Sequence, residues 1–180
     1  MLIANNMRPD SEQNIVVLGV GNTIHSDDGL GVHALRRLEQ DVRLPVGISL
    51  VDGGTRGLEL VASVHDCSRL LILDAVDVGE APGTFVRMAG DELRGLSTGA
   101  SVHQLAVADL LNTLPLVSDI EREIVLLGIQ PHSTDWGTDL SEPVEAAMGA
   151  LVERALEQLL SWSQEIAKSN SSNFQAVVAN

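Results

Sequence analysis

The sequence predicts a single-domain α/β fold, a three-layer sandwich in which a mainly parallel, twisted five-stranded sheet has helices on both faces. Five short apolar runs alternate along the chain with segments whose apolar residues recur at helical spacing. The runs are largely continuous in their apolar character, as in strands that are covered on both faces. The chain has 180 residues, 44% of them hydrophobic, which is enough for one domain with a sizeable core.

Each predicted strand is a short apolar and β-branched run that ends close to a turn-forming residue. Glycine, aspartate or proline follows every run within two residues. The five runs span residues 15–20, 48–51, 70–73, 84–88 and 124–129. In such sheets, ligands bind beyond the carboxyl ends of the strands, so the residues just after each run are the first candidates for a functional site.

Amphipathic helices are predicted between the strands, because apolar and charged residues there fall on opposite faces of a helix. The first begins at Leu30 and ends before Pro45, and a shorter one follows near Leu58. The next has Ser101 in the N-cap position and Pro115 as its end.

The two ends of the chain differ from its middle. A long amphipathic helix is predicted over residues 143–166, and residues 167–180 after it are expected to form a disordered tail. Residues 1–14 are expected to be flexible, and they are too polar to contain the apolar region of a secretory signal. The single domain is therefore expected over residues 15–166, in a cytoplasmic protein.

The charge and the cysteine content exclude several classes of function. Lys and Arg number 11 and Asp and Glu 25, which gives a net charge of −14. Such a charge repels phosphate backbones and anionic lipid, so no nucleic acid and no membrane is expected as a partner. A monomer is the default expectation.

The single cysteine, Cys67, excludes an intramolecular disulfide and a thiolate cluster. Any metal must therefore bind through His, Asp or Glu.

The glycine-rich segment 19–22 follows the first predicted strand, as it does in dinucleotide-binding folds. That fingerprint requires a third glycine where this chain has Ile24, and Asp27 and Asp28 follow where pyrophosphate would lie. A phosphate-binding lysine is also missing from this segment. A nucleotide-binding regulatory domain is therefore the least favoured functional class.

Three side chains that can bind a metal ion together are expected at one edge of the sheet. Asp28 precedes the first helix, Asp74 ends the third strand, and His103 opens a later helix. Two carboxylates and an imidazole form a ligand set for a borderline divalent metal and leave coordination positions for a substrate. The neighbouring Asp27 is interpreted as a helix-capping carboxylate instead.

The order of the motifs resembles that of the [NiFe]-hydrogenase maturation endopeptidases. The family's opening motif is similar to residues 17–31, and its DGGT turn to Asp52-Gly53-Gly54-Thr55. The further matching segments are residues 71–75, 81–84, 101–105 and 127–131, so that the resemblance covers about residues 15 to 160.

The resemblance implies an endopeptidase that removes the C-terminal extension of the hydrogenase large-subunit precursor once nickel has been inserted. Asp28, Asp74 and His103 then correspond to the metal positions, with Asp28 and Asp74 also the catalytic candidates. The Ni²⁺ is expected to arrive with its partner, the nickel-loaded precursor. A non-proteolytic nickel-binding assembly chaperone is the main alternative.

The resemblance leaves other roles open. The turn made by Asp52, Gly53, Gly54 and Thr55 is a substrate-contacting or a structural motif. The family is grouped with aspartic-type endopeptidases, but this chain lacks the D-T/S-G signature, so a pepsin-like pair of aspartates sharing one proton does not follow. Whether a metal-activated water or a carboxylate general base would perform the cleavage stays open.

The remaining candidates have simpler interpretations. Cys67 has no partner for activation other than the neighbouring His65, which favours a buried, inert thiol. His25 and His132 fall in loops at the presumed active edge and are interpreted as ordinary loop residues.

Overall fold

The computed structural model describes residues 14–97 and 102–178, and their side chains except those of residues 94–97, 102–105 and 172–178. The expected flexible segment 1–14 thus lies almost wholly outside the described residues. Five strands form one sheet in the order β2-β1-β3-β5-β4. The strands are β1 (Ile15–Val20), β2 (Ser49–Gly54), β3 (Arg69–Ala75), β4 (Phe85–Ala89) and β5 (Glu123–Ile129).

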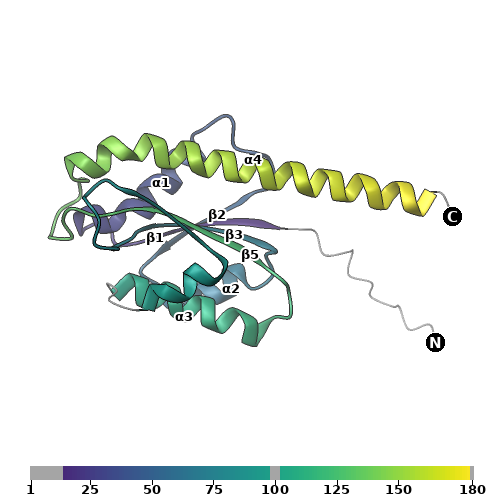
Figure 1. Cartoon of the computed structure of the whole chain (residues 1–180), viewed down its shortest axis with the longest axis horizontal. Helices are drawn as coiled ribbons and strands as arrows, with labels where there is room; N and C mark the ends of the chain where they lie inside the picture. The colour runs from purple at the N-terminus through teal and green to yellow at the C-terminus, as the bar shows by residue number, and fades with distance from the viewer. Residues whose placement is uncertain (1–13, 98–101, 179–180) are drawn as a thin grey trace.

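All neighbouring strands run parallel except β4, which pairs antiparallel with β5 at one edge. Helices cover both faces, as Figure 1 shows: α1 and α4 lie on one face, and α2 and α3 on the other. The helices are α1 (Leu30–Glu39), α2 (Val61–Val64), α3 (Val102–Val117) and α4 (Glu142–Val178). Three short 3-10 helices complete the described elements: η1 (Ser26–Gly29), η2 (Gly57–Leu60) and η3 (Gly90–Ser97). The predicted single-domain α/β fold is therefore confirmed.

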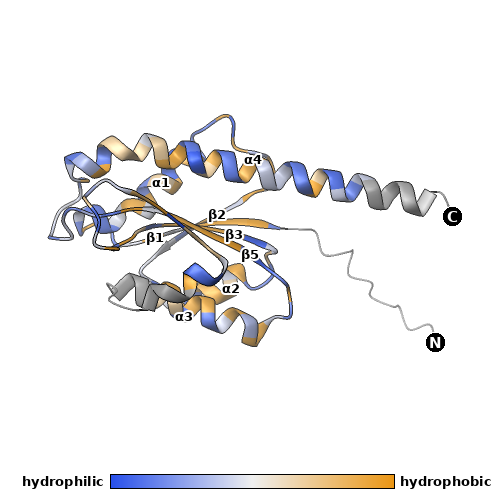
Figure 2. Cartoon of the chain, in the orientation of Figure 1, coloured by the Kyte–Doolittle hydropathy of each residue, from blue (hydrophilic) through white to orange (hydrophobic). Residues whose placement is uncertain are grey.

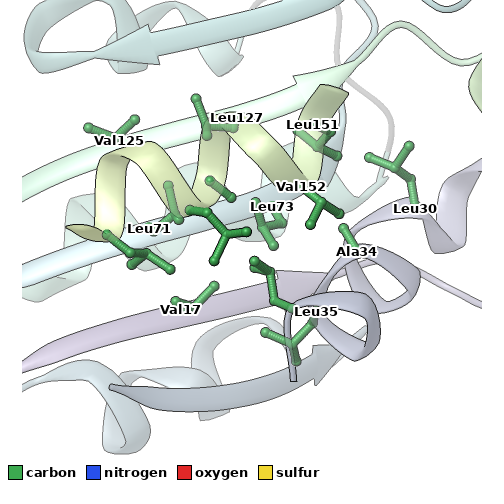
Figure 3. Packing of buried hydrophobic residues seen from close by; sticks show 14 of the residues in the cluster. Val17, Leu30, Ala34, Leu35, Leu71, Leu73, Val125, Leu127, Leu151 and Val152 are labelled. Carbon is green, nitrogen blue, oxygen red and sulfur yellow. The ribbon is translucent and has the colours of Figure 1, made fainter. Parts of the chain in front are cut away.

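The core has two halves because successive residues of a strand point to opposite faces of the sheet. In β1, Val17 packs toward α1 and α4, whereas Leu18 packs toward α2 and α3. Figure 2 shows the resulting apolar strands between two helical layers. In Figure 3, Leu71 and Leu73 of β3 point into the same cluster as Val152 of α4.

Two predicted helix ends differ from the structure. Pro115 lies inside the last turn of α3, which ends at Val117 rather than at the proline. Because the missing N–H of a proline removes only one hydrogen bond near a helix end, the turn persists, and the amide of Ser118 still donates to the carbonyl of Leu114 at 3.2 Å. At the other end, α4 continues over residues 167–178, where a disordered tail was expected. Neither glycine nor proline interrupts that segment.

Candidate active site

Asp74 and Asp28 lie at the carboxyl edge of the sheet. Asp74 is the penultimate residue of the central strand β3 and pairs in register with Gly128 of β5. Asp28 lies in η1, which follows β1 after the short loop over residues 21–25, and β1 flanks β3 on its other side. The order of the sheet therefore brings together two residues that lie 46 positions apart in the chain.

The carboxyl group of Asp74 is buried without a described partner. Its exposed fraction is 1%, and neither of its oxygens has a hydrogen-bond partner among the described residues. Burial raises the pKa of Asp74 well above its usual range, the negative charge of Asp28 raises that pKa further, and the nearby amide of Ala75 opposes the shift only partly. The folded environment of Asp74 therefore disfavours its ionised form.

Glycines make room for Asp28. Gly21 has φ +121°, and a Cβ there would collide with the backbone carbonyl of Asp28. At Gly31, a Cβ would collide with the carbonyl oxygens of Val20 and Leu73. The absence of these side chains lets the start of α1 pack directly on the ends of β1 and β3. In that position Asp28 is 7% exposed, and its Oδ2 accepts a hydrogen bond of 3.0 Å from the amide of Asn22.

His103 lies in the first turn of α3, and its side chain is outside the described part of the structure. The next turn of α3 contributes Ala106 and Val107 to a small pocket that Val20 and Gly54 also line. The helix therefore begins at the same edge of the sheet as Asp28 and Asp74. Among the described side chains, no group of three His, Cys, Asp or Glu residues could hold a metal ion. The predicted three-residue ligand set thus stays a prediction.

The turn of the DGGT motif lies beside the aspartate pair. In the pairing of β1 with β2, Gly19 faces Asp52 and Val20 faces Gly54, so Gly53 is an extra residue that forms a β-bulge. A Cβ at Gly53 would lie 2.9 Å from side-chain carbons of Leu18 and Val20, which explains the glycine on packing grounds.

The side chains of this turn face outward. Asp52 is exposed, and its carboxylate lies 3.8 Å from the guanidinium of Arg36. Thr55 is exposed as well. The carbonyl of Gly54 accepts a hydrogen bond of 2.9 Å from the amide of Gly21, which fixes the turn to the loop before Asp28. These contacts give the turn a structural part in the site, and its contact with substrate stays a prediction.

Asp27 has a role that the sequence analysis missed. It lies in the first turn of η1, as the capping interpretation expects, but its described side-chain hydrogen bonds go to a distant loop and not to helix amides. Its fully buried carboxylate accepts hydrogen bonds from the amides of His132, Ser133 and Ser141 at 2.8, 3.0 and 2.7 Å, and from the hydroxyl of Ser141 at 2.7 Å. Burial by itself would raise the pKa of Asp27, but these donors outweigh it and lower the pKa. Asp27 thus holds the loop over residues 131–141 against η1.

Gln130 holds a second loop. This 6% exposed side chain accepts hydrogen bonds from the amides of Val78 and Glu80 at 2.8 and 3.2 Å, and it donates one of 3.0 Å to Asp77. The loop that follows Asp74 is therefore tied to the end of β5. Nothing in the spacing of Asp27 or Gln130 identified these contacts, because their partners lie about 50 to 114 residues away in sequence.

Cys67 and the two loop histidines, His25 and His132, lie outside the aspartate pair. Cys67 is fully buried, which confirms the predicted burial; burial raises the pKa of its thiol, and the thiol donates to the carbonyl of Val64 at 3.0 Å. It also precedes β3, at the opposite end of the strand from Asp74. His132 is exposed, and its backbone amide, not its ring, makes the contact with Asp27. The ring of His25 lies 4.4 Å from that of Trp136, centroid to centroid.

More than half of the chain matches a known protein family. The family described as hydrogenase maturation protease matches residues 32–158 of the chain. The chain belongs to the hydrogenase maturation protease family. This maturation protease is therefore a peptidase by family, and the resemblance inferred from the motifs is confirmed.

Named relatives are similar to this chain over most of their own length. The hydrogenase expression/formation protein HoxM of Azotobacter vinelandii is 38% identical over 81% of this chain and 72% of its own. The hydrogenase 2 maturation protease of Escherichia coli is 37% identical over 84% of this chain and 91% of its own.

Solved structures share the fold of the maturation protease. The hydrogenase maturating endopeptidase HybD from Escherichia coli has a TM-score of 0.77 and 33% identity, and the match covers 82% of this chain and 93% of HybD. The [NiFe] hydrogenase maturation protease HybD from Thermococcus kodakarensis has a TM-score of 0.70 and 27% identity, over 81% of this chain and 99% of its own.

Within the described residues, no helix is long and apolar enough to span a membrane.

Proposed function

We propose that this maturation protease removes the C-terminal extension of the [NiFe]-hydrogenase large-subunit precursor, and that it recognises nickel already bound in that precursor. The observation that supports this most directly is the buried carboxyl group of Asp74, which has no described hydrogen-bond partner and lies close enough to the charge of Asp28 for its pKa to respond. A buried polar group without a partner is costly, and such groups concentrate at functional sites.

A divalent cation fits this pair chemically. It would offset both causes of the raised pKa of Asp74, namely the desolvation of the charged form and the repulsion from Asp28. Asp28, Asp74 and His103 are the residues that we expect to contact the nickel of the precursor, since carboxylate and imidazole are suitable ligands for nickel. In this proposal the nickel is part of the substrate rather than a resident cofactor of the protease.

Two roles of the aspartates are compatible with cleavage by water. When bound, nickel supplies Lewis-acid polarisation of a carbonyl group or of water. Asp28 and Asp74 position the peptide at the end of β3, and one of them can accept a proton from water as a general base. A carboxylate that contacts a metal is a weaker base, so the two roles compete within each aspartate. The aspartic-type grouping is part of this proposal, without a shared-proton pair as in pepsin.

The test of the proposal compares nickel-loaded with metal-free precursor. We expect the loaded precursor to lose mass at its C-terminus through cleavage at a single site, and the metal-free precursor to resist. Intact-mass spectrometry of the precursor after incubation measures both. Equal cleavage of the two forms would contradict nickel recognition, whereas binding of the loaded form without any mass loss would favour a nickel-binding chaperone. The reaction is expected in the cytoplasm, with a monomeric protease.

Substitution of His103 tests the proposed ligand set. We expect His103→Ala to weaken the binding of Ni²⁺ by about 10- to 100-fold, since loss of one ligand from a sparse set is poorly compensated. Isothermal titration of the unaltered and substituted proteins with Ni²⁺ measures the change. His65→Ala is a matched control, because His65 is exposed and its Nδ1 contacts only the carbonyl of Ala62 among its described partners. An unchanged affinity in His103→Ala would remove His103 from the set.

A further inference from the structure

Next to the aspartate pair, the protein exposes a large aromatic side chain on a loop that is held in place. Trp136 is 78% exposed, whereas the other tryptophan, Trp162, is 1% exposed in the core. Ile24, on the neighbouring loop, is 48% exposed, and the ring of His25 stacks on Trp136 at 36° between the two planes. We call these three side chains, Ile24, His25 and Trp136, the Trp136 rim.

The two loops that carry the rim are fixed to each other by backbone hydrogen bonds. The amide of Ser26 donates to the carbonyl of Gly137 at 2.8 Å, and the amide of Gly137 donates to the carbonyl of Ile24 at 3.1 Å. The ring Nδ1 of His25 lies 3.1 Å from the carbonyl of Thr134. Together with the hydrogen bonds to Asp27, these contacts leave the loop little freedom, although Trp136 itself is directed toward solvent.

The backbone conformation that presents the rim has a cost in free energy. Ser26 has φ +46°, a left-handed conformation that serine rarely adopts. The loop is held by the fully buried carboxylate of Asp27, and burial of a charge is unfavourable unless it is fully hydrogen-bonded. An exposed indole on a loop that strain and a buried charge hold in place is consistent with a binding role.

The rim is continuous with the candidate active site. The amide of Asp28 donates to the carbonyl of His25 at 3.0 Å, so the rim and the aspartate pair share one short stretch of backbone. A polypeptide bound at Asp28 and Asp74 therefore lies next to the rim. The net charge of −14 disfavours a nucleic acid as the molecule that stacks on Trp136.

We propose that the Trp136 rim is a substrate-docking surface, on which the hydrogenase large-subunit precursor packs an apolar segment close to its scissile bond. This inference rests on the proposed function, since it names the precursor as the occupant. A rigid aromatic side chain loses little conformational entropy on binding, which is why tryptophan is frequent among the residues that dominate binding energy. Trp136 thus contributes to affinity for the precursor, and the chemistry stays with the aspartate pair.

Steady-state cleavage of nickel-loaded precursor tests the rim. For Trp136→Ala we expect KM to rise roughly tenfold or more with kcat nearly unchanged, and for Trp136→Phe we expect most of the affinity to be kept. Leu116→Ala is the matched control, because Leu116 is 83% exposed near the far end of α3, away from the site. An unchanged KM in Trp136→Ala would overturn the proposal.

Hydroxyl-radical footprinting separates failure of the rim from failure of the proposed function. Saturating precursor should protect Trp136 from oxidation and leave Leu116 as reactive as before, with the modified peptides of this chain measured by mass spectrometry. Protection of Trp136 supports the docking surface even if the unaltered protein does not cleave the precursor. The absence of cleavage would count against the proposed function alone. Equal oxidation of Trp136 with and without precursor would overturn the docking surface whether or not cleavage occurs.

Discussion

Asp74→Asn is expected to slow cleavage of nickel-loaded precursor by about 10²–10⁴-fold, the range typical of a lost general base or positioning carboxylate. Asparagine keeps the shape of the side chain but can neither ionise nor provide a charged ligand. The rate is measured as mass loss of the precursor with time. Asp109→Asn serves as the control, since Asp109 is exposed on α3. A rate within about twofold of the unaltered protein would exclude Asp74 from the reaction.

The same substitution should remove a pH dependence of stability. Because the pKa of Asp74 is raised in the folded state, the folded protein binds more protons than the unfolded chain above the usual value near 3.8. The contribution of Asp74 to stability is therefore present below pH 3.8 and is lost as the pH rises through the folded-state pKa. Asparagine mimics the neutral acid at every pH.

We expect the free energy of unfolding of Asp74→Asn to fall less steeply with rising pH than that of the unaltered protein, with both proteins in metal-free buffer. Urea unfolding at a series of pH values above 3.8 measures this difference. Parallel curves for the two proteins would contradict a raised pKa for Asp74.

Asp27→Ala is expected to cost about 3–5 kcal/mol of stability, the largest effect on folding that we anticipate. The substitution leaves three backbone amides and one hydroxyl without their acceptor. The individual bonds to a charged group are worth about 1.5–3 kcal/mol each, but they act as a unit and do not add. Urea unfolding near neutral pH measures the loss. Asp135→Ala, in the same loop, is the matched control, because Asp135 is exposed and should cost less than about 1 kcal/mol.

Asp27 and Asp74 should respond to pH in opposite directions. The folded-state pKa of Asp27 is lowered, so its contribution is present above about pH 3.8 and is lost as the pH falls through the folded-state value. We therefore expect the unaltered protein to lose stability at acid pH more steeply than Asp27→Ala. If both proteins showed the same acid dependence, the four hydrogen bonds would not hold the charge as described.

Much of the fold followed from local patterns. The strand over residues 15–20 was predicted with its observed bounds, because a short, β-branched apolar run that ends at a glycine turn favours a buried strand over a helix. The carboxyl edge of the sheet was predicted as the site because Asp28 and Asp74 each follow or end such a run. Helix ends were less predictable: the end of α4 depends on the absence of helix breakers, which permits a helix without requiring one.

The sequence by itself determined the fold class, the family and the position of two aspartates at the sheet edge. Apolar periodicity can be read from residues that are close in the chain, and the order of the motifs can be read along it. Only the tertiary structure decided where the side chains of the adjacent Asp27 and Asp28 lie and what they contact. Asp28 lies near Asp74, whose oxygens have no described partner, whereas Asp27 accepts four hydrogen bonds from a loop more than 100 residues away. The physical reason is that the pKa and the role of a carboxylate depend on its burial and on its donors, and long-range packing supplies both.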